Sequence, residues 1–312
     1  MKKEKLILAA VSLFLVIISL VGVSVAIGAV QNETSVEKNA KESVREKEDE
    51  ITKKTFQVFI SGLDTYGEKD RSKRSDLNLL VTVNPSEKRL LITGIPRDLY
   101  VSFPSESTNE EKQKTKFSHL SLYGTKSLVQ GAEELLDTKI DYYIQLNMSG
   151  FRKLIDAIGG VDVEADRSFE TDWKTSFQKG INHVNGKEAL TFVREGHHHS
   201  KGVEQRNKNH QEMLKAILKQ VMKKNLMEMD INALYKLCKK NVRTDMKAGE
   251  ILSLMRWQKE EKVEWEMETA TIKGKFALET LAEYHDAKLY VEKVDQRSLD
   301  QVSKKIKKLL NS

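Results

Sequence analysis

The sequence predicts an α/β fold, a three-layer α-β-α sandwich around a mixed central sheet, preceded by one N-terminal transmembrane helix. Three observations support this fold. A long apolar run follows a cluster of lysines at the N-terminus, apolar segments of strand length crowd into residues 56–95, and helical and strand patterns alternate after them. The net charge of +6 is mild and the two signs interleave, so nucleic acid is not an expected partner.

The first 30 residues form the predicted anchor. The 25 residues from Leu6 to Val30 carry no charge and, at about 1.5 Å per residue, are long enough to span a bilayer. A cleaved signal peptide is the alternative, but its apolar core is normally only about 7–15 residues long. The lysines at positions 2, 3 and 5 predict a cytoplasmic N-terminus. We therefore expect a single-pass protein of the cell membrane with an extracellular C-terminal domain.

Residues 31–55 are almost wholly polar with mixed charges and have no apolar stripe, which predicts a solvated stalk. The folded part begins at Phe56. Strands are expected at 56–63, 77–84 and 89–95. The last two are joined by a short Asn-Pro-Ser-Glu-Lys turn, which is typical of an antiparallel hairpin.

This topology brings three strand ends to one edge of the sheet. They are the end of the first strand, the start of the second and the end of the third, and they carry Asp64, Arg74 with Asp76, and Arg97 with Asp98. Guanidinium groups bind phosphate oxygens, and carboxylates can hold a divalent metal that neutralises the remaining charge. The edge therefore suits a phosphate or diphosphate ligand. Ordinary surface ion pairs are the alternative, and spacing alone does not decide between the two.

The rest of the chain alternates between helices and strands. The expected helices cover residues 127–136, 149–158, 206–224 and 299–310, the expected strands cover 142–146, 161–163 and 263–271, and 185–194 is a helix or a helix–strand transition.

A second polar cluster lies around the expected helix 206–224. Arg194 ends an apolar stretch, and Arg206 lies on the same helical face as an apolar stripe that includes Met213. Asn209 and His210 share that face. An arginine there is either paired internally or points into a cleft, and periodicity does not exclude capping or core pairing.

Other residues that can carry chemistry are less informative. The consecutive histidines His197 to His199 have no further His or Cys at ligand spacing, so a metal site there is not expected, and their role is left open. His119 and the single cysteine, Cys238, are expected to be structural. The sequence contains no G-x-S-x-G, P-loop or G-x-G-x-x-G motif.

Seven segments occur in an order typical of one bacterial family. They are FISGLDTY (59–66), RSDLNLLVTVNP (74–85), ITGIPRDLYV (92–101), KFSHLSLYG (116–124), IDYYIQLNMSGFRKLIDAIGGVDV (140–163), KGINHVNGKEALTFVRE (179–195) and GVEQRNKNHQ (202–211). On these segments the chain resembles the LytR-CpsA-Psr family of cell-wall proteins. The resemblance places the catalytic core at 56–225. Because no Pro- or Gly-rich linker follows, residues 226–312 are expected to pack on the same domain.

The resemblance implies an activity. Family members transfer a glycopolymer, such as teichoic acid or capsular polysaccharide, from a polyprenyl-diphosphate carrier to a peptidoglycan hydroxyl. The product is a phosphodiester, and polyprenyl phosphate is released. The resemblance also implies a magnesium ion bound by aspartates, arginines on the diphosphate and an apolar tunnel for the lipid.

The resemblance assigns roles to individual residues. Asp64 and Asp76 match the aspartates at Mg²⁺, and Arg97 matches an arginine that contacts the diphosphate. The other matching basic residues are Arg74, Lys116, Arg194 and Arg206. We expect Asp76, Arg97 and Asp98 to be catalytic, with Asp76 or Asp98 taking the acceptor proton. Because a metal-bound carboxylate is a poor base, Asp98 is favoured.

Three positions depart from the family pattern: Gly196 and Val203 stand where the family commonly has an arginine and an aspartate, and His210 stands where it has a glutamine. Each lost arginine removes a charged hydrogen bond worth about 1.5–3 kcal/mol. An alternative is therefore a weakly active or inactive member that binds the lipid diphosphate and acts as an envelope or transcriptional regulator. DNA-binding attenuation is opposed by the predicted topology and by the lack of a compact basic recognition helix.

Overall fold

The computed structural model describes residues 50–65, 73–104, 113–195, 202–223, 241–261, 263 and 265–312. The predicted anchor at 1–30 and the predicted stalk up to residue 49 lie outside these residues, as do His197 to His199 and Cys238. Among the described helices, none combines the length and the apolar character that a membrane crossing requires. The first described element is the 3-10 helix η2 (Glu50–Thr52), in which Ile51 is buried.

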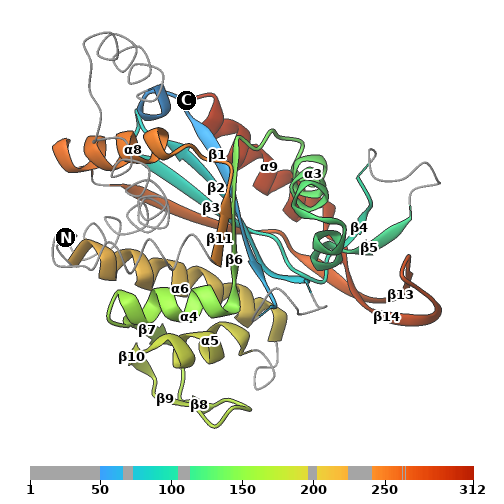
Figure 1. The fold of residues 1–312 in the computed structure, drawn as a ribbon. Helices are drawn as coiled ribbons and strands as arrows, with labels where there is room; N and C mark the ends of the chain where they lie inside the picture. The colour runs from blue at the N-terminus through green and yellow to red at the C-terminus, as the bar shows by residue number, and fades with distance from the viewer. Residues whose placement is uncertain are drawn as a thin grey trace. The chain divides into compact units, whose positions relative to one another are not determined.

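The chain forms two compact units, each assembled from separated stretches of sequence. The first, which we call the strand unit, comprises residues 56–83, 91–149 and 268–312. The second, which we call the helix unit, comprises the residues up to 55 together with 84–90 and 150–267. Figure 1 labels their elements.

The strand unit is built on a mixed sheet, as predicted. Its strands are β1 (Phe56–Leu63), β2 (Ser75–Asn84), β3 (Arg89–Gly94), β6 (Tyr142–Asn147) and β12 (Glu266–Thr271). They lie in the order β6-β1-β2-β3-β12. β1 runs antiparallel to β2 and parallel to β6, which confirms the α/β class with a mixed central sheet.

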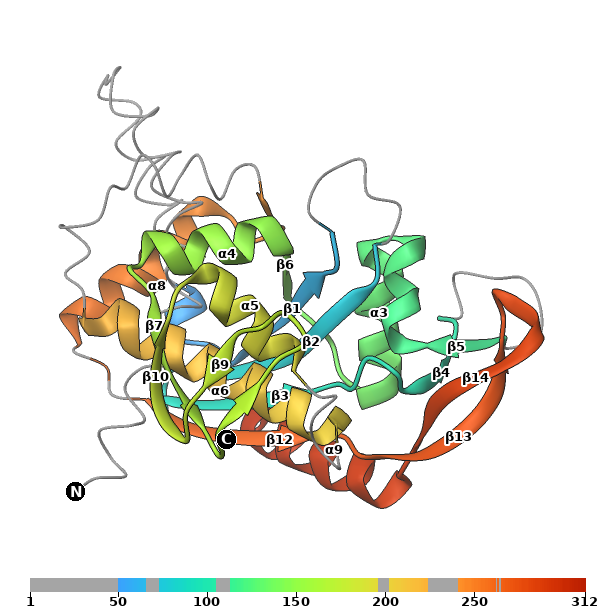
Figure 2. The same cartoon turned by 90° about the horizontal axis from the view of Figure 1, so that it is seen from below.

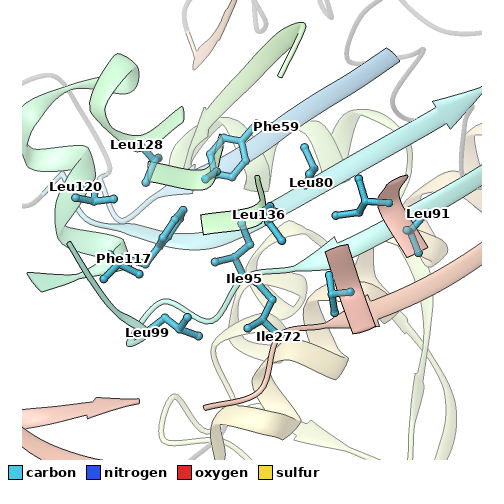
Figure 3. Packing of buried hydrophobic residues seen from close by; sticks show 14 of the residues in the cluster. Phe59, Leu80, Leu91, Ile95, Leu99, Phe117, Leu120, Leu128, Leu136 and Ile272 are labelled. Atoms are coloured by element: carbon cyan, nitrogen blue, oxygen red, sulfur yellow. The ribbon is translucent and has the colours of Figure 1, made fainter. Parts of the chain in front are cut away.

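Both faces of β1 and β2 are buried, which explains why these strands are continuous apolar runs rather than alternating ones. One face is covered within the strand unit by two helices, α3 (Thr125–Leu136) and α9 (Gln296–Leu310), which contribute to the same apolar cluster as Phe59 and Leu80. Figure 3 shows Phe59, Leu136 and Ile95 gathered in this cluster. A second helical layer on the other face stays a prediction.

Two hairpins complete the strand unit. β4 (Tyr100–Ser102) pairs with β5 (Lys114–Lys116), which leads into the 3-10 helix η3 (Phe117–Tyr123). β13 (Gly274–Leu281) pairs with β14 (Tyr284–Val294). Figure 2 shows the long β13–β14 hairpin beside β4 and β5. The sequence did not predict this hairpin, because its Ala282-Glu283 turn lacks the Gly, Asn, Asp or Pro that usually marks one.

The helix unit contains three predicted helices and one unpredicted helix. They are α4 (Met148–Ala157), which begins at the boundary of the strand unit, α5 (Gly186–Arg194), α6 (Gly202–Lys223) and the unpredicted α8 (Ala248–Glu260). Its strands are β7 (Val161–Ala165), β8 (Phe169–Glu170), β9 (Ser176–Phe177), β10 (Gly180–Val184) and β11 (Val242–Thr244). The predicted stripe of α6 is buried at Met213, Leu214 and Ile217. The strand expected from Val263 begins only at Glu266, since Val263 and Trp265 are buried outside the ladder.

Candidate functional site

The edge of the sheet predicted from the strand order exists in the strand unit, and a β-bulge shapes it. Gly62 faces Leu77 across the β1–β2 ladder, and Leu63 faces Ser75, so Asp76 is the extra residue of the bulge on β2. Beyond the ladder, the Asp64 amide donates to the Arg74 carbonyl at 2.8 Å. A bulge re-aims side chains next to it. The strand ends therefore hold Asp64 and Asp76 at one edge, as expected.

Arg97 lies in the loop after β3, between two buried apolar residues, Ile95 and Leu99. Main-chain hydrogen bonds fix this loop: the Ile95 amide donates to the Asn78 carbonyl at 3.0 Å, and the Ser118 amide donates to the Arg97 carbonyl at 2.9 Å. The Arg97 guanidinium donates from Nη1 to Asp76 Oδ1. Strands β2 and β3 thus bring a predicted arginine and a predicted carboxylate together.

The Arg97 guanidinium keeps an unused donor. Its Nε is buried and forms no hydrogen bond within the described residues, lying 3.8 Å from Asp98 Oδ2. No hydrogen bond or ion pair is described for the Arg74 side chain at the same edge, where it is half-buried. A buried donor without an acceptor is costly, so an oxyanion that accepts from Nε would be favoured here.

Lys116 and Asp98 form the second ion pair of the site. Lys116 Nζ lies 2.7 Å from Asp98 Oδ1, and both side chains are mostly buried, with 15% and 13% exposed. Lys116 ends β5, whose pairing with β4 places Lys116 opposite Tyr100. We call the six residues at this edge the strand-end cluster: Asp64, Arg74, Asp76, Arg97, Asp98 and Lys116. All six belong to the strand unit.

The sequence reasoning missed two residues beside this cluster, Tyr290 and Glu292 on β14. The Glu292 amide donates to the Asp98 carbonyl at 2.8 Å, and Tyr290 Oη donates to Glu292 Oε1 at 2.9 Å. Burial and the neighbouring Asp98 raise the pKa of Glu292, while Tyr290 and Lys116 oppose this shift. Burial and Glu292 also raise the pKa of Tyr290. No motif in the sequence marked either residue.

His119 has the structural role expected of it. It is buried in η3, with Nδ1 at 3.6 Å from Glu283 Oε1, and the Thr115 hydroxyl lies 2.8 Å from both Glu283 carboxylate oxygens. Burial alone would raise the pKa of Glu283, but the hydrogen bonds from His119 and Thr115 hold it below its ordinary value. This group fixes the β13–β14 turn against β5.

Asp64 and Asp76 suit a metal ion only if water and a phosphate ligand supply the rest of its coordination shell. Within the described residues, no group of three or more His, Cys, Asp or Glu side chains could hold a metal ion. Mg²⁺, however, is usually held by one or two carboxylates, with water and substrate phosphates completing its shell. Asp64 and Asp76 lie at the same strand edge, and Asp76 pairs with the guanidinium of Arg97, whose Nε donor is unused. They fit a metal that arrives with a phosphate ligand.

The two other predicted arginines lie in the helix unit. Arg194, at the end of α5, places its guanidinium 5.8 Å from the centre of the Trp173 ring. Arg206, on α6, donates from Nη2 to the Arg194 carbonyl at 3.2 Å. Asn209 Nδ2 donates to the carbonyls of Phe192 at 2.9 Å and Glu195 at 3.3 Å. The internal pairing left open for this face is therefore present, and diphosphate contact by Arg194 and Arg206 stays a prediction.

Comparison with known proteins identifies the family. The model of the LytR_cpsA_psr family matches residues 20–308, which is most of the chain. The chain belongs to the LytR-CpsA-Psr family. The resemblance read from the motifs is thereby confirmed.

Named relatives of this LytR-CpsA-Psr protein include cell-wall transferases. The polyisoprenyl-teichoic acid–peptidoglycan teichoic acid transferase TagU of Bacillus cereus is 33% identical over 184 residues, which are 58% of each chain. Biofilm regulatory protein A of Streptococcus mutans is 31% identical over 182 residues, 54% of this chain and 45% of that protein. The chain thus matches about half the length of these two relatives. The crystal structure of B. subtilis TagV superposes with a TM-score of 0.67 at 26% identity, covering 83% of this chain and 98% of TagV.

Proposed function

We propose that this LytR-CpsA-Psr protein is a membrane-anchored extracellular phosphotransferase. It moves a glycopolymer of the teichoic acid or capsular polysaccharide type from a polyprenyl-diphosphate carrier to peptidoglycan. The observation that carries the proposal is the strand-end cluster, in which Arg97 is held by Asp76 and keeps a buried Nε donor without an acceptor. The name of TagU, a teichoic acid transferase to peptidoglycan, supports the same class of reaction.

The binding step uses the basic residues of the cluster. A diphosphate oxygen accepts from Arg97 Nε, and Arg74 and Lys116 supply further positive charge at the same edge. Asp64 and Asp76 would hold Mg²⁺, which neutralises negative charge on the phosphates when it is bound. Diphosphate binding by Arg194 and Arg206 is proposed on the family resemblance alone.

The transfer step needs a base and charge stabilisation. The acceptor hydroxyl loses its proton as its oxygen attacks the phosphorus that bears the glycan, and the bond to the bridging oxygen breaks. Polyprenyl phosphate leaves with the electron pair. Asp98 takes the proton, because Asp76 is assigned to the metal and a metal-bound carboxylate is a poor base. Arg97 and Lys116 stabilise the charge on the leaving phosphate.

The test replaces Arg97 with alanine in the full chain, reconstituted with a lipid-diphosphate glycan, peptidoglycan and Mg²⁺. Transfer is expected to fall at least about 100-fold, because a phosphate-binding donor used in the transition state is lost. Arg89→Ala is the matched control, since Arg89 forms an ion pair with Glu87 at 3.0 Å outside the cluster. Wild-type turnover by a folded Arg97→Ala variant would refute the proposal. Binding of donor by wild type without any product would instead favour the inactive, regulatory alternative.

A further inference from the structure

The C-terminal hairpin places a buried acidic residue against the strand-end cluster. Only 7% of Glu292 is exposed, its amide donates to the Asp98 carbonyl at 2.8 Å, and it forms a parallel bridge with Leu99. Gly274, on β13, pairs with Val294 and lies two residues before Phe276, the cross-strand partner of Glu292. A Cβ atom at Gly274 would come within 2.5 Å of Glu292 Cβ and 3.0 Å of Glu292 Oε2. The absence of a side chain at position 274 therefore makes room for Glu292.

Four side chains form a continuous series of contacts from this carboxylate to Asp98. Tyr290 Oη donates to Glu292 Oε1 at 2.9 Å. Lys116 Nζ lies 5.4 Å from the centre of the Tyr290 ring, within the range of a cation–π interaction. Lys116 Nζ then donates to Asp98 Oδ1 at 2.7 Å. Lys116 is thus held from two sides, by a carboxylate and by an aromatic face.

We propose that Tyr290 and Glu292 are positioning residues that aim the Lys116 ammonium at Asp98. The proposal rests on the roles proposed above for Lys116 and Asp98. A lysine carries its charge on a flexible four-carbon chain and loses much rotational freedom when it is ordered. The Tyr290 ring restricts that chain, and Glu292 restricts the ring. Lys116 is therefore ordered before a ligand arrives, which lowers the entropic cost of the reaction.

The Glu292 carboxyl lies where its charged form is disfavoured. Burial and the neighbouring Asp98 raise its pKa, and the Tyr290 hydroxyl and Lys116 oppose this shift only in part. A carboxyl group whose pKa is higher in the folded state than in the unfolded chain lowers stability as the pH rises. Groups with perturbed pKa values gather at functional sites, which agrees with the positioning role that the contacts of Glu292 indicate.

The test measures the rate at which acetic anhydride labels Lys116 in the full chain in detergent, read by mass spectrometry. Tyr290→Leu removes the ring, and Lys116 labelling is expected to rise roughly 3- to 10-fold, since a cation–π contact and its ordering are lost. Tyr290→Phe keeps the ring and is expected to give a smaller rise. An unchanged rate in a folded Tyr290→Leu variant would overturn the proposal.

A matched control lies on the same strand. The ring of Tyr284, at the start of β14, has its centre 6.3 Å from that of His119. Tyr284→Leu makes the same change on β14 and is expected to leave Lys116 labelling unchanged. If Tyr284→Leu raised Lys116 labelling as much as Tyr290→Leu did, the effect would be general loosening of the hairpin, and the proposal would fall.

Transfer rates separate this inference from the proposed function. If Tyr290 acts through Lys116, the double variant Lys116→Met/Tyr290→Leu is expected to transfer no more slowly than Lys116→Met alone. A change in Lys116 labelling, together with no transfer by wild type, would leave the positioning pair standing and remove the proposed function. Normal transfer by wild type, together with unchanged Lys116 labelling in Tyr290→Leu, would leave the proposed function standing and remove the positioning role of Tyr290 and Glu292.

Discussion

Arginine has different surroundings in the strand-end cluster and at the contact between α5 and α6, where Arg194 and Arg206 lie. Arg97, in the strand unit, pairs with a carboxylate and retains a buried donor that no described residue accepts. Arg206, in the helix unit, donates to a main-chain carbonyl at the end of α5, and Arg194 lies over an indole ring. The first arrangement has capacity left for an anion. The second already stabilises its own unit, so residue type alone does not identify a ligand site.

The largest expected effect concerns Asp98, the proposed base in the strand-end cluster. Asp98→Asn keeps an acceptor for Lys116 but removes the basic carboxylate, so transfer is expected to fall about 10²- to 10⁴-fold; because it also removes one charge of a mostly buried ion pair, the melting temperature is expected to fall as well. Initial transfer rates and thermal unfolding measure the two effects. Asp137→Asn is the control, because Asp137 pairs with Lys307 on the surface of the same unit. Full activity in Asp98→Asn would move the base to another residue.

The second-largest expected effect concerns the contact between α5 and α6, where polar side chains stabilise the helix unit. Asn209 is 3% exposed and bonds two carbonyls at the end of α5. Asn209→Ala removes both of these buried hydrogen bonds, although the Phe192 carbonyl still accepts from the Glu195 amide at 3.3 Å, and it is expected to lower the free energy of unfolding by about 1–3 kcal/mol. Urea denaturation measures this change in the free energy of unfolding. Asn182→Ala, on the two-stranded β7–β10 sheet, removes a side-chain bond to the Gln178 carbonyl at a less buried position and is expected to cost less. An equal loss of unfolding free energy in the two variants would show that the buried Asn209 bonds stabilise the protein no more than an ordinary surface hydrogen bond does.

A smaller expected effect concerns Glu283, a residue of the strand unit that stabilises the fold and has no role in the proposed reaction. The pKa of Glu283 lies below its ordinary value of 4.5 in the folded protein. The stability that Glu283 contributes is therefore present above about pH 4.5 and is lost as the pH falls through the lower, folded-state pKa. Glu283→Gln is expected to flatten this part of the stability profile, measured by urea unfolding from pH 6 to 3. An identical profile in the variant would contradict the assignment.

The smallest expected effect concerns Arg194. Trp173 is largely exposed, and a cation–π contact at such a site is worth about 0.5–1 kcal/mol. A double-mutant cycle of Trp173→Ala and Arg194→Ala is expected to return a coupling of that size in the free energy of unfolding. Zero coupling, with a loss of donor binding in Arg194→Ala, would bring Arg194 closer in behaviour to Arg97.

The part of the site that follows from local sequence was predictable. The Asn-Pro-Ser-Glu-Lys turn joins neighbouring strands β2 and β3, and this short connection alone carries Arg97 back to the edge at which Asp76 begins. The bulge that singles out Asp76 was not predictable, because it depends on the register with β1. Periodicity placed Arg206 on the buried face of α6 but could not choose between a carbonyl partner and a cleft.

The missed residues depend on contacts between distant parts of the chain. Tyr290 and Glu292 reach the cluster only because β14 runs beside Leu99, and a turn without the usual turn residues connects β13 to β14. The alternation in these strands was also obscured, since Phe276 and Leu278 are apolar yet exposed. A single sequence carries no signal for such a pairing.

The contact between Thr115 and Glu283 has a consequence for the order of folding. The two residues are 168 positions apart, and a contact of such separation forms late because its closing entropy must be met first. An intermediate structured only through the first half of the protein would already hold all six charged side chains of the strand edge. It would lack Tyr290, so the proposed ordering of Lys116 would be completed only when the C-terminal hairpin docks.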